Sequence, residues 1–333
     1  MQKTISIIIA IFNRKDELFE LLNSLIAQTD KNFEVIIVDD GSSVDLLPTV
    51  ETFKEMLEIQ YFKKTNSGPG LSRNYGARRA KNDWLVFVDS DVIVEKDYIE
   101  NIKKNLEKTD CAAFGGADKA HKGFNILQKA ISYSMTSVFT TGGIRGSKKA
   151  VTRFQPRSFN MGVNKEIFLK IGGFSEMRIG EDPDLSMTIW ENGYQTAFFD
   201  NIGVYHKRRT DLGKFSKQVY QFGCARPILN QRHPNYVKPT FWFPTLFLLG
   251  YVAGILEYFL LHKGFVLACY GIYTFVIFFH ALLLTKNLAI AAQAIITTYI
   301  QMFSYGYGFL ESWVKLNILR MKPEEAFPKH FHK

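Results

Sequence analysis

The chain has 333 residues, 47% of them hydrophobic, and a net charge of +9 at neutral pH. This length allows about two domains, and the composition excludes a disordered or collagen-like chain. The three cysteines, Cys111, Cys224 and Cys269, are widely spaced, so neither a disulfide framework nor a zinc site is expected. The positive charge favours phosphate-bearing partners such as nucleotides, anionic lipids or nucleic acids.

The first part of the chain alternates between short apolar runs, typical of buried strands, and runs with helical spacing. The expected strands are 5–11, 33–38, 59–62 and 84–88, and the expected helices are 14–29, 44–57 and 68–81, the last opening with a loop. This alternation predicts an α/β domain with a mostly parallel sheet and helices on both faces. In such a domain, ligands bind beyond the carboxyl ends of the strands.

Two acidic clusters follow predicted strands. Residues 39–42 read Asp-Asp-Gly-Ser, and residues 89–91 read Asp-Ser-Asp. Aspartate is common in turns and helix caps, so each cluster has a purely structural interpretation. The functional interpretation is that the first cluster recognises a base or ribose. Asp89 and Asp91 would then approach a divalent ion together with substrate phosphates.

Three further segments carry candidate functional groups. Residues 66–74 form a glycine-rich loop that opens a helix and contains Arg73, which suits a diphosphate, although the P-loop ending is missing. Glu181 and Asp182 precede a predicted helix over 185–192, where acidic residues either cap the helix or supply a general base. His206 follows a short predicted strand, and a lone histidine is more often structural than a metal ligand.

Taken in order, these segments resemble a family-2 glycosyltransferase with the GT-A fold, a Rossmann-like domain. The resemblance spans about residues 5–206. Its motifs are Phe12–Asn13 after the first strand, VDDGS at 38–42, GLSRN at 70–74, VDSD at 88–91, FNMGVNKEIFLKIGGF at 159–174 and GEDPDL at 180–185. Each motif is weak by itself, but all of them in this order and spacing are specific.

The resemblance implies a nucleotide-sugar donor, with a UDP-sugar as first choice, and a divalent cation, Mg²⁺ or Mn²⁺. It implies inverting transfer by direct displacement. The residues that would surround the nucleotide are Ala10, Phe12, Asp39, Asp40, Arg73 and Asp89.

The same resemblance assigns the metal and the acceptor side. Asp89 and Asp91 would hold the metal, and His206 matches a histidine that contacts the metal in some GT-A enzymes. Asp182 matches the catalytic base, with Glu181 beside it. Gly162 would lie in the loop that shapes the acceptor side.

Three long apolar runs follow the predicted catalytic domain. They are 240–261, 265–284 and 288–309, and each has the roughly 20 residues that a membrane-crossing helix needs. Lysine and arginine are dense in 207–239, just before the first run. The positive-inside rule therefore places the catalytic domain, 1–239, on the cytoplasmic side of the inner membrane.

The tail, 311–333, is also basic, and an even number of crossings would leave it on the same side as the catalytic domain. The third run contains Gln293 and Gln301 and is the weakest of the three. It either crosses the membrane, enters and returns, or lies at the interface, so two and three crossings both remain open.

Polysaccharide synthases of the family that extend a polymer carry a QxxRW motif, and no such motif occurs here. One sugar per acceptor is therefore expected. The apolar runs favour a lipid-linked or glycan acceptor in the synthesis of bacterial surface polysaccharide. The basic stretches 145–157 and 207–217 either bind diphosphate or anionic lipid headgroups, or form a solvated face.

Two other interpretations stay open. One is a membrane-anchored GT-A scaffold without activity, against which the retained acidic motifs argue. The other is a nucleotidyltransferase, which usually carries a glycine-rich loop after the first strand, whereas 11–15 contains no glycine. Nucleic-acid binding is not expected, because the basic residues lie in no recognisable nucleic-acid motif.

Overall fold

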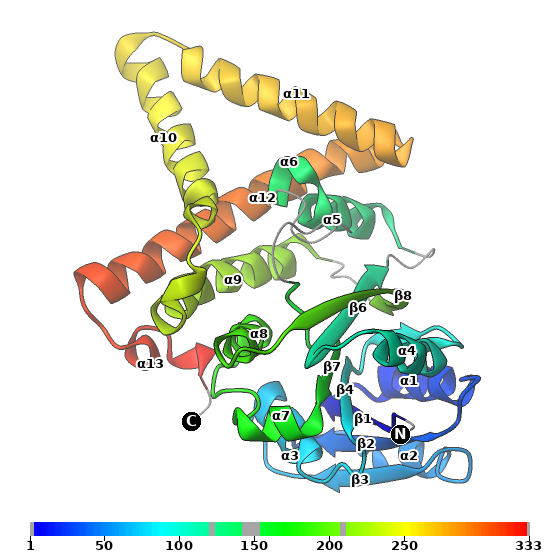
Figure 1. The fold of residues 1–333 in the computed structure, drawn as a ribbon. Coiled ribbons are helices and arrows are strands. Elements are labelled where there is room, and N and C mark those ends of the chain that lie inside the picture. Colours follow the sequence, from blue (N-terminus) through cyan, green and yellow to red (C-terminus); the bar gives the residue numbers. More distant parts are fainter. Residues whose placement is uncertain (1–2, 120–123, 142–153, 207–210, 332–333) are drawn as a thin grey trace. The chain divides into compact units, whose positions relative to one another are not determined.

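The computed structural model describes residues 3–119, 124–141, 154–206 and 211–331 (Figure 1). The chain forms two compact units. The first comprises Met1–His121, Ala150–Lys207 and Lys329–Lys333, and the second comprises Lys122–Lys149 and Arg208–Pro328. The expected division at residue 239 assigns residues 208–239 to the catalytic domain, whereas these residues belong to the second compact unit.

The first unit contains an eight-stranded mixed sheet with the strand order β3-β2-β1-β4-β7-β6-β8-β5. The strands are β1 Ile5–Ile11, β2 Phe33–Asp39, β3 Ile59–Lys63, β4 Trp84–Asp89, β5 Val92–Val94, β6 Ala113–Lys119, β7 Asn160–Asn164 and β8 Thr196–His206. The strands β1 to β4 pair in parallel, as expected from the alternation of strands and helices. In contrast, β7 runs antiparallel to β4 and β6.

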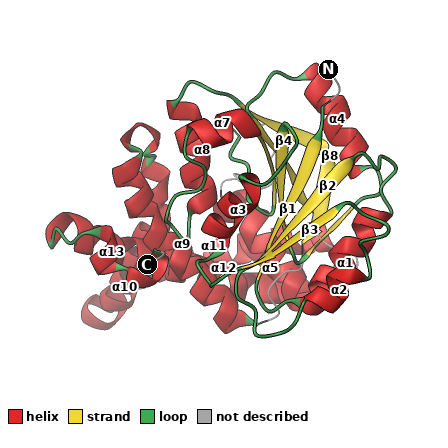
Figure 2. Ribbon diagram, turned by 90° about the horizontal axis from the view of Figure 1, so that it is seen from below, coloured by secondary structure: helices red, strands yellow, loops and turns green. Residues whose placement is uncertain are grey.

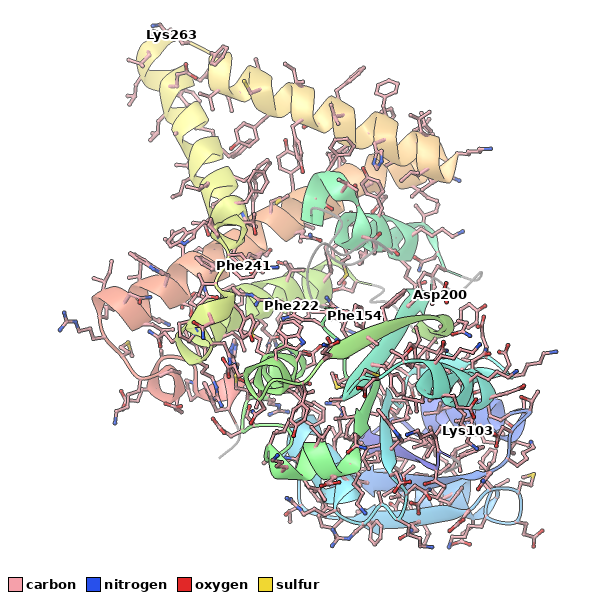
Figure 3. The ribbon with its side chains drawn as sticks, in the orientation of Figure 1. Lys103, Phe154, Asp200, Phe222, Phe241 and Lys263 are labelled. Atoms are coloured by element: carbon pink, nitrogen blue, oxygen red, sulfur yellow. The ribbon has the colours of Figure 1, made fainter. Side chains whose placement is uncertain are left out.

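Helices cover both faces of this sheet (Figure 2). They are α1 Lys15–Ile26, α2 Leu47–Glu51, α3 Pro69–Ala77, α4 Tyr98–Lys108, α7 Lys165–Lys170 and α8 Glu181–Glu191. The predicted helix over 44–57 is too long, because α2 spans only Leu47–Glu51. Before this helix, the backbone N–H of Ser43 donates to the side chain of Asn13. Lys103 of α4 reaches Asp30, after α1, at 2.8 Å (Figure 3).

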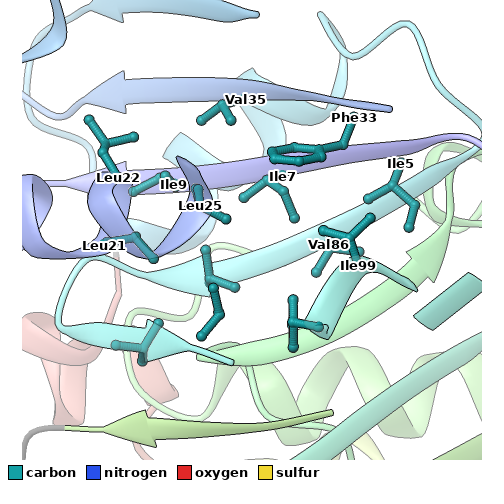
Figure 4. Close-up of a cluster of buried hydrophobic side chains, with 14 of the residues drawn as sticks. Ile5, Ile7, Ile9, Leu21, Leu22, Leu25, Phe33, Val35, Val86 and Ile99 are labelled. Atoms are coloured by element: carbon teal, nitrogen blue, oxygen red, sulfur yellow. The ribbon is translucent and has the colours of Figure 1, made fainter. Parts of the chain in front are cut away.

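The core lies between the sheet and its helices because successive strand residues point to opposite faces. Ile5, Ile7 and Ile9 of β1 point to the face covered by α1 (Figure 4). Ile8, between them, is also fully buried and lies against Gly76 of α3 on the other face. A strand that is buried on both faces reads as a continuous apolar run, which is why β1 could be predicted from the sequence.

Gly162 does not lie in a loop, so that expectation is wrong. It is the middle residue of β7, where it pairs with Val86 of β4 and Phe114 of β6. A Cβ atom at this position would lie 2.0 Å from Cζ of Phe114, whose side chain is fully buried. The glycine is therefore required by the packing of an aromatic ring over the strand.

The described residues of the second unit form helices and their connections. They are α5 Ile126–Thr136, α6 Val138–Thr141, α9 Leu212–Arg232, α10 Phe243–Leu261, α11 Phe265–Thr285, α12 Leu288–Trp313 and α13 Pro323–Ala326, with 3-10 turns at Pro234–Tyr236, Pro239–Trp242 and Pro328–His330 and a π-helical turn at Val314–Ile318. The three predicted apolar runs correspond to α10, α11 and α12.

Among the residues that the structure describes, three segments are long and apolar enough to cross a membrane: Pro239–Leu261, Phe265–Thr285 and Leu288–Ile318. In the first two segments, 11% of the most apolar stretch of 18 residues is buried inside the protein, whereas in the third segment 39% of this stretch is buried. The difference arises because α12 packs against α5 and α9 as well as α10 and α11. The contact with α9 is close, since a Cβ at Gly223 would lie 2.3 Å from the carbonyl oxygen of Tyr305.

The end of the chain belongs to the first unit. Phe331 forms an isolated antiparallel bridge with Met177, and the backbone N–H of Arg178 donates to the carbonyl of His330 at 2.7 Å. Phe331 is buried. The catalytic domain is thus completed by residues that follow all three apolar helices in the sequence.

Candidate active site

The ends of three neighbouring strands bring the predicted motifs to one edge of the sheet. Ala10 of β1 pairs with Val38 of β2 on one side and with Asp89 of β4 on the other. Ile11 pairs with Asp39. Because these strands are parallel, their carboxyl ends meet at the same edge, where ligands of such sheets bind.

Asp39 is fully buried and both of its carboxylate oxygens accept hydrogen bonds. Oδ1 accepts from the backbone N–H of Ser42 at 2.8 Å, and Oδ2 accepts from the hydroxyl of Tyr61 at 2.8 Å. Burial of the phenol, together with the carboxylate of Asp39, raises the pKa of Tyr61. Asp39 thus holds the turn after β2 and a side chain of β3, and its contact with a nucleoside stays a prediction.

Asp40 organises the glycine-rich loop. Its Oδ1 accepts from Nζ of Lys64 at 2.6 Å and from the hydroxyl of Ser72 at 2.8 Å. The backbone N–H groups of Ser67 and Gly68 donate to Oδ1 and Oδ2, at 2.9 and 2.7 Å. A carboxylate with this many charged or backbone donors is strongly anchored. The loop that opens α3 therefore depends on Asp40.

Asn13 connects the ends of β1 and β2. Its backbone is left-handed, with φ of 55°, a conformation that asparagine tolerates better than most residues. Its side-chain Oδ1 accepts from the backbone N–H of Ser43, and its own N–H donates to the hydroxyl of Ser42. The neighbouring Phe12 is 48% exposed at this edge, which leaves an aromatic face accessible to a ligand.

Asp91 lies just beyond Asp89, after β4, and forms an ion pair with Arg14, which follows β1. Within the described ranges, no group of three or more His, Cys, Asp or Glu side chains is arranged to hold a metal ion. His206 ends β8 opposite Val92 of β5, but its side chain lies outside the described part of the structure. Two neighbouring carboxylates nevertheless fit Mg²⁺ or Mn²⁺, which take carboxylate and phosphate oxygens as ligands.

Arg73 joins two of the acidic motifs. Its side chain is buried, with only 3% of the residue exposed. Nη2 donates to Oδ1 of Asp89 at 2.7 Å, and Nη1 donates to Oε1 of Glu181 at 3.2 Å. Burial opposes the charge of Arg73, but the two carboxylates outweigh this effect and raise its pKa. The segments around Asp89 and Glu181 are 92 residues apart in sequence and meet at this guanidinium.

A second contact strengthens this junction. The side-chain amide of Asn74 donates to the carbonyl of Phe174 at 2.7 Å and accepts from the backbone N–H of Phe174 at 2.9 Å. The guanidinium of Arg73 lies 5.4 Å from the centre of the Phe174 ring, within the range of a cation–π contact. The N-terminal half of α3 is therefore fixed against the segment that leads into α8.

Glu181 and Asp182 occupy the first turn of α8, which begins four residues earlier than predicted. Glu181 is buried against Arg73, whereas Asp182 is partly exposed. Burial, followed by the negative charge of Asp182, raises the pKa of Glu181 to about 7, although Arg73 acts in the opposite direction. The two acids therefore have different environments, and Asp182 is the more accessible.

Sequence reasoning missed several side chains of this edge. Lys64, Tyr61 and Arg14 each bind one of the predicted aspartates, and Asn13 and Asn74 fix the loops. A signal existed for Asn13 and Asn74, which belong to the Phe12–Asn13 and GLSRN motifs. Lys64, Tyr61 and Arg14 lie in loops or on β3, and a single sequence carries no information on which distant aspartate they meet.

Replacing Asp40 tests its role in the loop. Asp40→Asn removes the ion pair with Lys64 and replaces one carboxylate acceptor with an amide donor, so we expect a loss of about 3 kcal/mol of unfolding free energy. The measurement is the shift of the thermal or denaturant midpoint. Asp16→Asn, on the exposed surface of α1, is the matched control and should change stability by less than about 0.5 kcal/mol. Equal effects of both substitutions would contradict the proposed anchoring.

The raised pKa of Glu181 predicts a pH dependence. The folded protein holds this proton up to about pH 7, whereas an unfolded glutamate releases it near 4.3. The contribution of the Glu181 carboxyl to the free energy of unfolding is therefore complete below about pH 4.3, and it is lost as the pH rises to about 7. Glu181→Gln cannot ionise, so its thermal midpoint should fall less than that of the wild type over this window.

Glu166→Gln, on the exposed first turn of α7, controls for loss of a surface charge and should follow the wild-type pH profile. A Glu181→Gln profile that runs parallel to the wild type would show that this carboxyl does not titrate near neutrality.

Comparison with known proteins identifies the family of this chain. The family model "Glycosyl transferase family 2" matches residues 6–171, which include the motifs at 38–42, 70–74 and 88–91. An uncharacterized glycosyltransferase of Haemophilus influenzae is 33% identical over 220 residues, which cover 62% of this chain and 70% of that protein. An uncharacterized glycosyltransferase of Rickettsia felis is 39% identical over 106 residues, but the match spans only 18% of its length.

Among solved structures, the mannosyltransferase PcManGT from Pyrobaculum calidifontis, in complex with GDP-Man and Mn²⁺, aligns with a TM-score of 0.56. The sequences are 18% identical, and the alignment covers 90% of this chain and 86% of that one. Residues 1–349 of S. aureus TarS, in complex with UDP, align with a TM-score of 0.50 at 18% identity, covering 90% of each chain. These likenesses confirm the GT-A fold. The chain belongs to glycosyltransferase family 2 and is an enzyme of the glycosyltransferase class.

Proposed function

We propose that this protein transfers one sugar, with inversion, from a nucleotide-sugar donor to a hydroxyl group of an acceptor. The observation that carries the proposal is the position of Arg73, which contacts both Asp89 and Glu181. Arg73 thus links the motif of Asp89, which suits a metal ion and a diphosphate, to the motif of Glu181, which suits a general base. Transfer needs both functions in one site, because the leaving group gains charge while the attacking hydroxyl loses a proton.

The donor proposed first is a UDP-sugar. The support is indirect: TarS has been solved with UDP and PcManGT with GDP-Man, and both share the fold of this chain. Phe12 is exposed beside the end of β1, where a base can stack on its ring. Asp39 and Asp40 lie at the same edge and are proposed to fix the nucleoside through the turn and the loop that they hold.

Asp89 and Asp91 are the residues proposed to hold Mg²⁺ or Mn²⁺, with His206 as a further candidate. A bound divalent ion supplies positive charge that stabilises the departing diphosphate. Asp91 is paired with Arg14 and Asp89 with Arg73, so each carboxylate already forms an ion pair with an arginine. The same two arginines add positive charge to the part of the site where the diphosphate is proposed to bind.

Asp182 is proposed as the base that takes the proton from the acceptor hydroxyl. Its partly exposed position in the first turn of α8 makes it accessible, while its buried neighbour Glu181 is held by Arg73. We assign Glu181 a positioning role, since its contacts fix the start of α8 and hence the backbone that carries Asp182. Gly162 is buried within β7 and receives no direct role in acceptor binding.

The acceptor is proposed to be lipid-linked or a membrane-associated glycan, in the synthesis of bacterial surface polysaccharide. The support is the apolar hairpin of α10 and α11, which exposes a continuous apolar surface over two segments long enough to span a bilayer. We place this hairpin in the inner membrane and the catalytic domain in the cytoplasm. Because α12 is covered by α5 and α9, we propose that it lies at the membrane surface, which gives two crossings and a cytoplasmic tail.

Donor turnover tests the proposed reaction. The purified full-length protein is incubated with a panel of nucleotide sugars, Mg²⁺ or Mn²⁺ and lipid-linked acceptors, and release of nucleoside diphosphate is measured. We expect release from one donor. Asp182→Asn should lower transfer by about 10²–10⁴-fold, the usual contribution of a general base. Asp91→Ala should lower it at least as much.

Asp110→Asn, exposed between α4 and β6 at the opposite edge of the sheet, is the control and should retain wild-type activity. Transfer by Asp182→Asn within about threefold of the wild type would contradict its role as a base. No release from any donor by folded protein would favour a scaffold without activity.

Thiol labelling tests the membrane arrangement. Lys263 lies in the turn between α10 and α11, and Arg320 lies after α12. In a Cys269→Ala background, we expect Lys263→Cys to be labelled only from outside intact cells or right-side-out vesicles. Arg320→Cys should be labelled only from inside, like Lys31→Cys on the exposed surface of the catalytic domain. Labelling of Arg320→Cys from outside would establish three crossings and contradict the proposal.

A further inference from the structure

Arg226, in α9, has a guanidinium group with unused hydrogen-bonding capacity. Its Nε and Nη1 atoms are buried and have no hydrogen-bond partner among the described residues. The group lies over the ring of Phe241, 4.2 Å from its centre. The ring fixes the plane of the guanidinium but cannot accept hydrogen bonds in that plane.

Such an arrangement is costly for the protein alone. Buried donors normally have a partner, and a buried charged group without one loses its hydration without compensation. A guanidinium is positively charged and planar, and its N–H donors point outward in that plane. A phosphate can accept two parallel hydrogen bonds from such a group with two of its oxygens.

The position of Arg226 identifies where that anion comes from. Phe241 is the third residue of the first candidate membrane span, Pro239–Leu261. The next residue, Trp242, packs edge-on against Phe309 and Trp313 of α12, at 4.8 and 5.3 Å between ring centres. Tryptophan is enriched at the boundary between lipid tails and headgroups. The guanidinium therefore lies at the level where lipid phosphates are found.

We propose that Arg226 binds the phosphate of a membrane lipid, with Phe241 holding the guanidinium flat. This inference goes beyond sugar transfer and does not rest on it. The shared chemistry is a lipid-borne phosphate, carried either by a bulk phospholipid or by a prenyl phosphate of the kind that links glycans to membranes. The function assigned to the site is to fix the start of α10 and the end of α9 against the headgroup layer.

The experiment measures thermal stabilisation of the full-length protein in a phosphate-free maltoside detergent. The added probes are phosphatidylglycerol, undecaprenyl phosphate, diacylglycerol and inorganic phosphate. We expect the first two to raise the melting midpoint of the wild type by about 2–4 °C or more, since each binds the folded state. Diacylglycerol, which has no phosphate, should have no effect. The larger shift between the two phosphate lipids identifies the natural source.

Arg226→Met is the critical variant. Methionine keeps the packing against Phe241 but removes the charge, so its midpoint without lipid should equal or exceed that of the wild type. The shift caused by phosphate lipids should disappear. Lys238→Met removes an exposed cation just before the first span and should retain the shift.

Three outcomes of lipid or phosphate addition would overturn the proposal. They are an equal lipid shift in Arg226→Met and the wild type, a wild type that no phosphate lipid stabilises, and stabilisation by inorganic phosphate equal to that by lipid. A lipid-free midpoint of Arg226→Met several degrees below the wild type would also contradict it, since that would show a structural role. Because the readout is melting, none of these results depends on finding the sugar donor.

Discussion

The arrangement of the catalytic edge depends on one buried guanidinium. Arg73 lies between Asp89, at the end of a strand, and Glu181, at the start of a helix, and it supplies the positive charge that the buried Glu181 carboxylate needs. The stabilisation is mutual, because Asp89 and Glu181 raise the pKa of Arg73 and so keep its buried guanidinium charged. Asn74, the next residue, binds the backbone of Phe174 with both of its amide atoms. A short helix therefore determines how the two acidic motifs face each other.

The strand ends of this site could be predicted from the sequence, because buried parallel strands appear as continuous apolar runs and their carboxyl ends meet at one edge. This is why Asp39 and Asp89 were found together with their strands. The partners of those aspartates could not be predicted. Lys64 and Arg14 lie in loops, and which carboxylate each meets is decided by tertiary packing and not by local pattern. Glu181 and Asp182 were found as a motif, but their different burial is visible only in the fold.

Two local errors have the same origin. The family resemblance placed Gly162 in a loop, yet this glycine lies within a strand and makes room for the ring of Phe114. The helix over 44–57 was expected from helical spacing, but the side chain of Asn13, 30 residues earlier, accepts the N–H of Ser43. In both places a residue distant in sequence overrides the local preference. The apolar helices were predicted well because their length and composition alone define them.

The bridge between Phe331 and Met177 has a consequence for biogenesis. Met177 precedes α8 in the sequence, whereas Phe331 follows α10, α11 and α12. The two residues can therefore pair only after all three apolar helices have been synthesised. Translation of these helices thus precedes completion of the first unit, although most of that unit is encoded before them.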